Sequence, residues 1–201
     1  MADATASPGQ GITRREFLNY VWGAAMSLFL AELGVGVYLF SLPRFREGEF
    51  GSDFDIGGLT EILPKPDGGP EAFADAKTWL VNIGPTEAAK GQGKQGLMAI
   101  YKVCTHLGCL YKFEPSTVRF ECPCHGSKFH QDGTKILQEG PAPRGLDRFI
   151  VELKDSTGKV VARTPESGDP LPLPADTAGL RVIVKTGQKI LGGPPKPDPV
   201  G

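Results

Sequence analysis

Cys104-Thr-His-Leu-Gly-Cys109 and Cys122-Pro-Cys-His-Gly-Ser127 are the two short boxes that decide the fold of this chain of 201 residues. They hold all four cysteines and two of the three histidines. Each box offers one thiolate and one imidazole a few positions apart, and each keeps a second cysteine. Structural zinc sites more commonly pair two cysteines close together in sequence. This mixed spacing therefore indicates a metal centre of another kind.

The two boxes resemble those of the Rieske iron–sulfur proteins of quinol-oxidising cytochrome bc-type complexes. In such a [2Fe–2S] centre two histidines replace two cysteines on one iron, with potentials of roughly −150 to +300 mV. The resemblance implies that Cys104 and Cys122 bind one iron, and that His106 and His125 bind the other. It also implies that His125 faces the quinol, where its second ring nitrogen accepts a proton. The two histidines should titrate as a coupled pair, so the midpoint potential should fall with rising pH.

The resemblance also gives roles to residues beside these ligands. Cys109 and Cys124 would form a disulfide that ties the two loops together. The Ser127 hydroxyl would donate to a bridging sulfur of the cluster. High-potential members of the family carry a tyrosine where this chain has Phe129. One hydroxyl donor is therefore missing, and we expect a lower midpoint potential, which would suit a quinol such as menaquinol.

Other interpretations of the boxes remain open. Two plain disulfides would leave the paired histidines unexplained, and a zinc-binding, membrane-anchored module without a redox role would leave two cysteines unused. A Rieske subunit of a periplasmic molybdenum oxidase, such as arsenite oxidase, is a further alternative. A long linker and the Ser127 donor favour the quinol-oxidising complex. The third histidine, His130, is expected to be a solvated loop residue outside the metal site.

Composition predicts a turn-rich β protein. Gly 27 and Pro 18 are high counts, and the net charge of −1 gives no electrostatic case for nucleic acid. We predict a mostly β, Rieske-type β-sandwich head over residues 59–190, with the boxes on loops at one end. A segment Gly140-Pro-Ala-Pro143 resembles the family's proline loop, which shields the cluster. Short strand-like runs cover 78–83, 97–103, 117–121, 148–153, 159–163 and 180–185.

The N-terminal part predicts one transmembrane α-helix. Tyr20 to Phe40 is almost wholly apolar, and at about 1.5 Å per residue it spans roughly 31 Å, the thickness of a hydrocarbon core. We assign residues 17–42 to the anchor. Its one charge, Glu32, either faces a partner subunit or lies near the interface.

The residues before the span set the expected orientation. Residues 1–16 contain Thr13-Arg-Arg-Glu16, which looks like a twin-arginine export signal. No small-residue cleavage site follows Phe40, so we expect the segment to be kept as an anchor. The expected location is a bacterial inner membrane, with residues 1–16 cytoplasmic and the head outside, where disulfides persist.

The remaining segments complete the expected function. Residues 43–58 read as a flexible linker that would let the head swing from the quinol site on a cytochrome b subunit to a c-type haem. Residues 191–201 read as an extended or disordered tail. The resemblance thus implies an electron-transfer subunit of a quinol:cytochrome c oxidoreductase, or of one with a soluble, plastocyanin-like acceptor.

Overall fold

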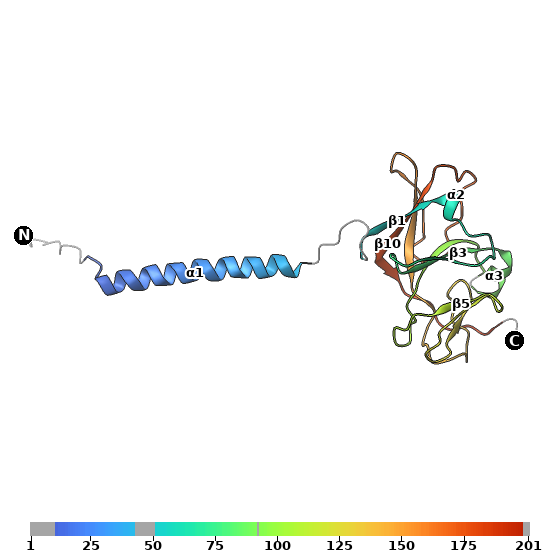
Figure 1. Ribbon diagram of the computed structural model, residues 1–201, viewed down its shortest axis with the longest axis horizontal. Helices are drawn as coiled ribbons and strands as arrows, with labels where there is room; N and C mark the ends of the chain where they lie inside the picture. Colours follow the sequence, from blue (N-terminus) through green and yellow to red (C-terminus); the bar gives the residue numbers. More distant parts are fainter. Residues whose placement is uncertain (1–10, 43–50, 92, 199–201) are drawn as a thin grey trace, which may run out of the picture. The chain divides into compact units, whose positions relative to one another are not determined.

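The computed structural model describes residues 11–42, 51–91 and 93–198, which form an N-terminal helix and a separate β domain. The helix α1 runs over Arg14–Ser41 (Figure 1). A capping box starts it: the Glu16 carboxylate accepts from the Thr13 N–H at 2.9 Å, and the Thr13 hydroxyl accepts from the Glu16 N–H. Within the described residues, α1 is the one helix long and apolar enough to cross a membrane, and it contains the predicted span.

The β domain is built on a seven-stranded antiparallel sheet, called the base domain below. Its order is β1-β10-β8-β4-β3-β2, and β9 pairs with β8 (Figure 1). Two short helices, α2 (Leu59–Ile62) and α3 (Pro85–Lys90), follow β1 and β3. The strands are β1 Asp53–Gly58, β2 Glu71–Phe73, β3 Thr78–Ile83, β4 Gly96–Tyr101, β8 Arg148–Lys154, β9 Val160–Arg163 and β10 Arg181–Ile190.

An apolar core holds the base domain together. Alternate side chains of an antiparallel strand point to one face, and here that face carries leucine and valine. Leu80, Leu97 and Leu153 come from β3, β4 and β8, and all three are fully buried with Val182 and Val184 of β10. This sheet provides the rigid support from which the remaining segments project.

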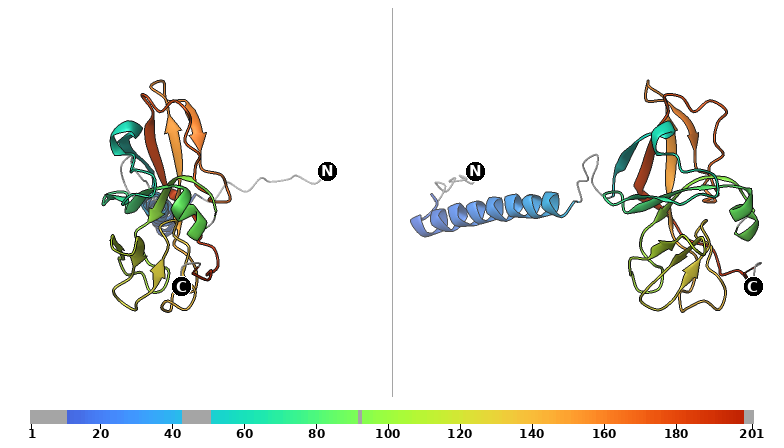
Figure 2. Two further views of the ribbon diagram at one scale, coloured as in Figure 1. Left: turned by 90° about the vertical axis from the view of Figure 1, so that its right-hand side faces the viewer. Right: turned by 45° about the vertical axis from the view of Figure 1, so that its right-hand side comes forward.

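Between β4 and β8 the chain leaves the sheet and forms a small lobe, residues 104–145. It contains a three-stranded sheet in the order β5-β6-β7, with bounds Lys112–Glu114, Arg119–Glu121 and Lys128–Phe129. The lobe lies at one end of the base domain in both views of Figure 2. Its core is aromatic: the Tyr111 ring packs 5.2 Å from Phe120 and 6.2 Å from Phe129.

Most expected elements are confirmed. The architecture is mostly β with one N-terminal apolar helix, and a strand overlaps every run predicted from the sequence. The linker prediction over 43–58 is wrong in its last third. Residues 43–50 lie outside the described chain, but Asp53–Gly58 forms β1 and pairs with β10. The charged residues of β1 belong to its outer face. Asp53 pairs with Lys185 at 2.7 Å, whereas the next residue, Phe54, is buried.

For the tail, residues 191–198 form no helix or strand, as the extended alternative expected. The disordered alternative is wrong for these residues, because the segment runs along the small lobe and bonds to it. The Leu137 N–H donates to the Lys196 carbonyl at 2.7 Å, and the Lys196 N–H donates to the Lys135 carbonyl at 2.8 Å. Arg119 and Asp198 form an ion pair at 2.5 Å. The tail therefore belongs to the folded domain.

Candidate metal centre

Two loops of the small lobe hold the boxes, and both loops close in the same way. The Cys104 N–H donates to the Cys109 carbonyl at 2.8 Å, and the Cys122 N–H donates to the Ser127 carbonyl at 2.9 Å. In each loop the fifth residue is a glycine with a left-handed backbone, Gly108 at φ 79° and Gly126 at φ 72°. Only glycine adopts this conformation without cost, so both boxes require it at that position.

The two loops bring two free thiols together in the interior. Cys104 and Cys122 are each 3 % exposed and take part in the aromatic core of the lobe. Burial raises the pKa of the Cys104 thiol to about 11, and the adjacent Cys122 sulfur adds to the rise. The Cys104 thiol is therefore protonated in the metal-free protein at neutral pH, and metal binding there must release its proton.

The two histidines meet at the surface beside these thiols. The His106 and His125 ring centroids lie 4.7 Å apart with the ring planes at 89°. His106 is half-buried and His125 is exposed. Four candidate donors, two buried thiols and two imidazoles, thus come from two loops that close in the same way. The thiols hold the first position of each loop, and the imidazoles hold the third position of one loop and the fourth position of the other.

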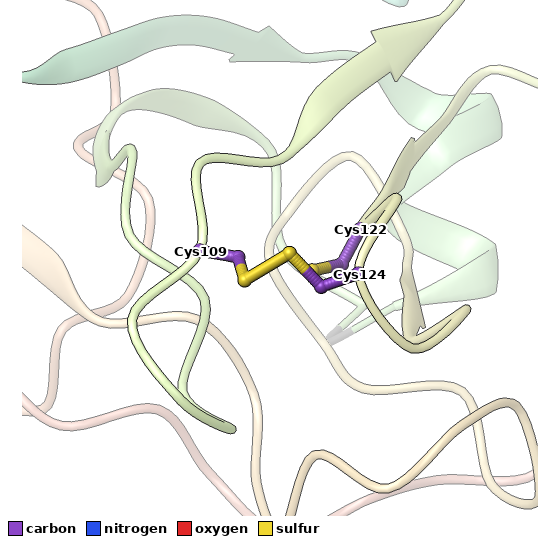
Figure 3. Close-up of side chains that lie close together, drawn as sticks. All are labelled: Cys109, Cys122 and Cys124. Atoms are coloured by element: carbon purple, nitrogen blue, oxygen red, sulfur yellow. A yellow bond between two sulfur atoms is a disulfide. The ribbon is translucent and has the colours of Figure 1, made fainter.

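A disulfide between Cys109 and Cys124 joins the loops, as the sequence predicted (Figure 3). The Cα atoms are 6.6 Å apart, and 15 positions separate the two cysteines in sequence. The Cys122 sulfur lies close by, and all three sulfurs fall within 4.8 Å of one another. These three do not form a metal site of their own, because sulfurs in a disulfide bond are not thiolates.

Ser127 connects the second box to the proline loop. Its side chain is fully buried, and its Oγ accepts a hydrogen bond from the Ala142 N–H at 3.1 Å. The hydroxyl proton is left to donate elsewhere, as the predicted role requires. The loop packs so closely that a Cβ at Gly140 would lie 2.4 Å from the Ser127 nitrogen. Gly140 is therefore needed for this contact.

Phe129 is fully buried beneath the boxes and packs against Tyr111. The Tyr111 hydroxyl could have supplied the donor that Phe129 lacks, but it donates to the Tyr101 carbonyl at 2.7 Å. This tyrosine therefore does not replace the missing hydroxyl in the present arrangement.

The expectation that His130 is solvated is wrong. Its side chain is 1 % exposed, and burial lowers its pKa below the usual value. It lies in a run of buried residues, 129–136, in which the Asp132 carboxylate accepts from the Thr134 N–H and hydroxyl. These local bonds let a polar run enter the interior, which composition alone does not reveal.

Sequence reasoning also missed Lys135. This lysine is 1 % exposed, and its Nζ donates to the carbonyls of Ile136 and Glu139. Its place in the sequence could have indicated this burial, because Lys135 follows the Asp132-Gly133 turn at the point where the chain returns along β7.

The donor set fits the group that the boxes predict. A [2Fe–2S] centre of mixed ligation needs two thiolates and two neutral imidazoles. The free cysteines could supply the first pair, and the facing histidines could supply the second. The disulfide holds the two loops in place without using either free thiol.

Comparisons with known proteins point in the same direction. Residues 73–152 match the family model described as the Rieske [2Fe-2S] domain. The cytochrome b6-f complex iron-sulfur subunit of Chlorobaculum tepidum is 30% identical over 153 residues, which cover 76% of each chain. The cytochrome b6-f complex iron-sulfur subunit 1 of Synechocystis is 29% identical, and the match covers 71% of this chain and 81% of that subunit. The chloroplastic subunit of Pisum sativum is 30% identical, covering 79% of this chain and 70% of its own.

Proposed function

Because this chain belongs to the Rieske iron–sulfur proteins of cytochrome bc-type complexes, we propose that it oxidises quinol and passes one electron to a c-type cytochrome haem. It carries a Rieske [2Fe–2S] cluster and a single-pass membrane anchor. A cytochrome b subunit would provide the quinol site. A c-type cytochrome subunit or a soluble carrier would be the acceptor.

The observation that carries the proposal is the meeting of the His106 and His125 rings beside two buried thiols. Cys104 and Cys122 would hold one iron, and the two histidines would hold the other. When bound, the cluster supplies a one-electron acceptor of relatively high potential. The protein would supply the separation of charges: thiolates inside, and neutral imidazoles at the surface.

His125 would receive the quinol. It is the more exposed of the two histidines, so the ring nitrogen that does not bind iron can reach a ligand from solvent. That nitrogen would accept the proton of the quinol hydroxyl when the electron leaves. Leu107 and Leu110 are exposed beside the boxes and would give the quinol an apolar surface.

The surroundings of the thiols favour a quinol of low potential, such as menaquinol. The ring at Phe129 has no hydroxyl, and the Tyr111 hydroxyl is occupied by a backbone carbonyl. Fewer donors to the ligating sulfurs leave the reduced state less stabilised, which lowers the midpoint potential.

The head would lie on the extracytoplasmic side of a bacterial inner membrane. The Cys109–Cys124 disulfide supports this side, since disulfides persist outside the reducing cytosol. Arg14 and Arg15 open α1 and would act as a twin-arginine export signal. Residues 1–16 would stay in the cytoplasm, and α1 would remain as the anchor.

Metal analysis of the purified full-length chain tests this proposal. We expect iron and inorganic sulfide in equal amounts, and a paramagnetic resonance signal on reduction. His106→Ala and His125→Ala should each lose the cluster, whereas His130→Gln should keep it, because His130 lies outside both boxes. Zinc in place of iron, or equal cluster loss in His130→Gln, would contradict the ligand set.

A further inference from the structure

Lys135 is a buried cation without an acidic partner. Its side chain is 1 % exposed, and its Nζ donates only to backbone carbonyls, those of Ile136 and Glu139. The Glu139 carboxylate instead pairs with Lys128 at 3.1 Å. Among the residues that the structure describes, no carboxylate lies within ion-pair distance of the Lys135 Nζ. A buried charge that is not neutralised nearby acts on its surroundings over a longer range.

The backbone places this lysine on the side of the ligand thiols. Lys135 stands opposite Phe129 in an antiparallel bridge, so the two side chains share one face. The Phe129 ring belongs to the same buried cluster as Cys104 and Cys122.

We propose that the buried ammonium group of Lys135 raises the reduction potential of the cluster held by Cys104 and Cys122. This inference rests on the ligand set proposed above. Two ferric ions, two sulfides and two thiolates sum to no net charge, and one-electron reduction adds one negative charge. A fixed positive charge nearby stabilises that reduced state. Lys135 therefore opposes the lowering expected from the missing hydroxyl at Phe129.

The size of the effect follows from simple electrostatics. Two unit charges about 10 Å apart, at an effective dielectric constant of about 20, alter an equilibrium by roughly tenfold. For a one-electron couple, a tenfold change corresponds to about 59 mV. Because Lys135 is buried, added salt should screen this effect far less than it screens a surface charge.

Redox titration of the full-length protein tests the proposal with three substitutions. Lys135→Met removes the charge and both donors, whereas Lys135→Gln removes the charge but keeps an amide that can donate to the same carbonyls. Both should lower the ratio of reduced to oxidised protein about tenfold at a fixed potential, in low and high salt alike. Lys135→Arg keeps the charge and should retain the native potential.

The matched control is Lys128→Met. Lys128 lies in the same lobe but is one-third exposed and paired with Glu139, so its loss should leave the potential almost unchanged. A native potential in Lys135→Gln would overturn the inference. A potential that falls in Lys135→Met but not in Lys135→Gln would also overturn it, because Lys135 would then act by positioning the carbonyls and not through its charge. If Lys135→Met does not assemble the cluster, the potentials of Lys135→Gln and Lys135→Arg test the proposal without it. Wild-type protein without iron would instead refute the proposed function.

Discussion

The base domain and the small lobe are both antiparallel β structures, yet different forces hold them. Five of the seven strands of the base domain have six or more residues, and they enclose a continuous apolar core in which Leu80, Leu97 and Leu153 are fully buried. The small lobe has strands of two or three residues, a disulfide and a buried polar run at 129–136. Such short strands bury little apolar surface and make few ladder hydrogen bonds.

This difference follows the chemistry that each region performs. Ligand loops must place thiols and imidazoles at defined positions, which leaves few residues for a hydrophobic core. Covalent and polar ties then supply the rigidity, because they fix a loop without requiring a long strand. The two regions should therefore respond differently to substitution. A substitution that removes apolar core volume from the base domain should reduce the overall stability. A substitution that removes the disulfide or a buried hydrogen bond from the lobe should alter the metal centre.

The largest effect is expected from the base domain. Leu153→Ala in β8 should lower the free energy of unfolding by about 4 kcal/mol, since a fully buried leucine leaves a cavity. The midpoint potential of folded protein should not change. Urea unfolding and a redox titration measure the two quantities separately. A shifted potential in this variant would mean that the two regions are not independent.

Loss of the disulfide should act on the small lobe. The double substitution Cys109→Ala and Cys124→Ala opens a loop of 15 residues, which corresponds to about 3 kcal/mol. Hydrogen exchange should quicken in β5, β6 and β7 well before it quickens in β3 and β4. Equal loss of protection in all five strands would show that the lobe has no separate stability.

Asp147 joins the two regions and should have an intermediate effect. Burial alone would raise its pKa, but Arg144, the Gly192 N–H and Lys189 together lower it below the usual value. Asp147→Asn should cost roughly 2 kcal/mol at neutral pH, as expected for hydrogen bonds to a charged group.

The pH dependence of the stability difference between wild type and Asp147→Asn is the control for this prediction. Because the folded pKa is the lower one, the unfolded chain takes up the proton first as the pH falls. The advantage of wild type over Asp147→Asn should be complete above the ordinary carboxyl pKa of about 3.9 and vanish below the folded value. An advantage that stays constant down to strong acid would refute the assigned ion pairs.

The sequence predicted the base domain better than the details of the lobe. The run 78–83 is rich in apolar and β-branched residues, and β3 occupies those six positions. Strands β5 and β7 have three and two residues, too few for a periodic pattern to form. β1 was missed because its aspartates pair with Arg181 and Lys185 across the strand, which no local pattern reveals.

The candidate ligands could be proposed from the sequence, but the residues that support them could not. Both boxes carry their own closing glycines, and the paired cysteines and histidines lie within a few positions in sequence. The contacts of Lys135 and the tail are between segments far apart in the chain, as in the Lys196–Lys135 backbone bond. His130 was misjudged because its burial depends on neighbours that satisfy the rest of its run.

The smallest effects are expected beneath the boxes, where single hydroxyl groups adjust the potential. Phe129→Tyr should raise the midpoint if the new hydroxyl donates to a ligating sulfur. One hydrogen bond contributes about 1 kcal/mol, which corresponds to about 40 mV for a one-electron couple. Ser127→Ala should lower the midpoint by a similar amount, because it removes a buried hydroxyl from the second box.

These two substitutions also test each other. The Ser127 Oγ accepts from the Ala142 N–H at 3.1 Å, so Ser127→Ala could in addition loosen the proline loop. Ser127→Thr keeps the hydroxyl and serves as the control, and it should hold the potential near the native value. If Phe129→Tyr leaves the midpoint unchanged while Ser127→Ala lowers it, the ring at position 129 only packs. A low midpoint potential, where the redox titration finds one, would then need another cause than the missing phenol.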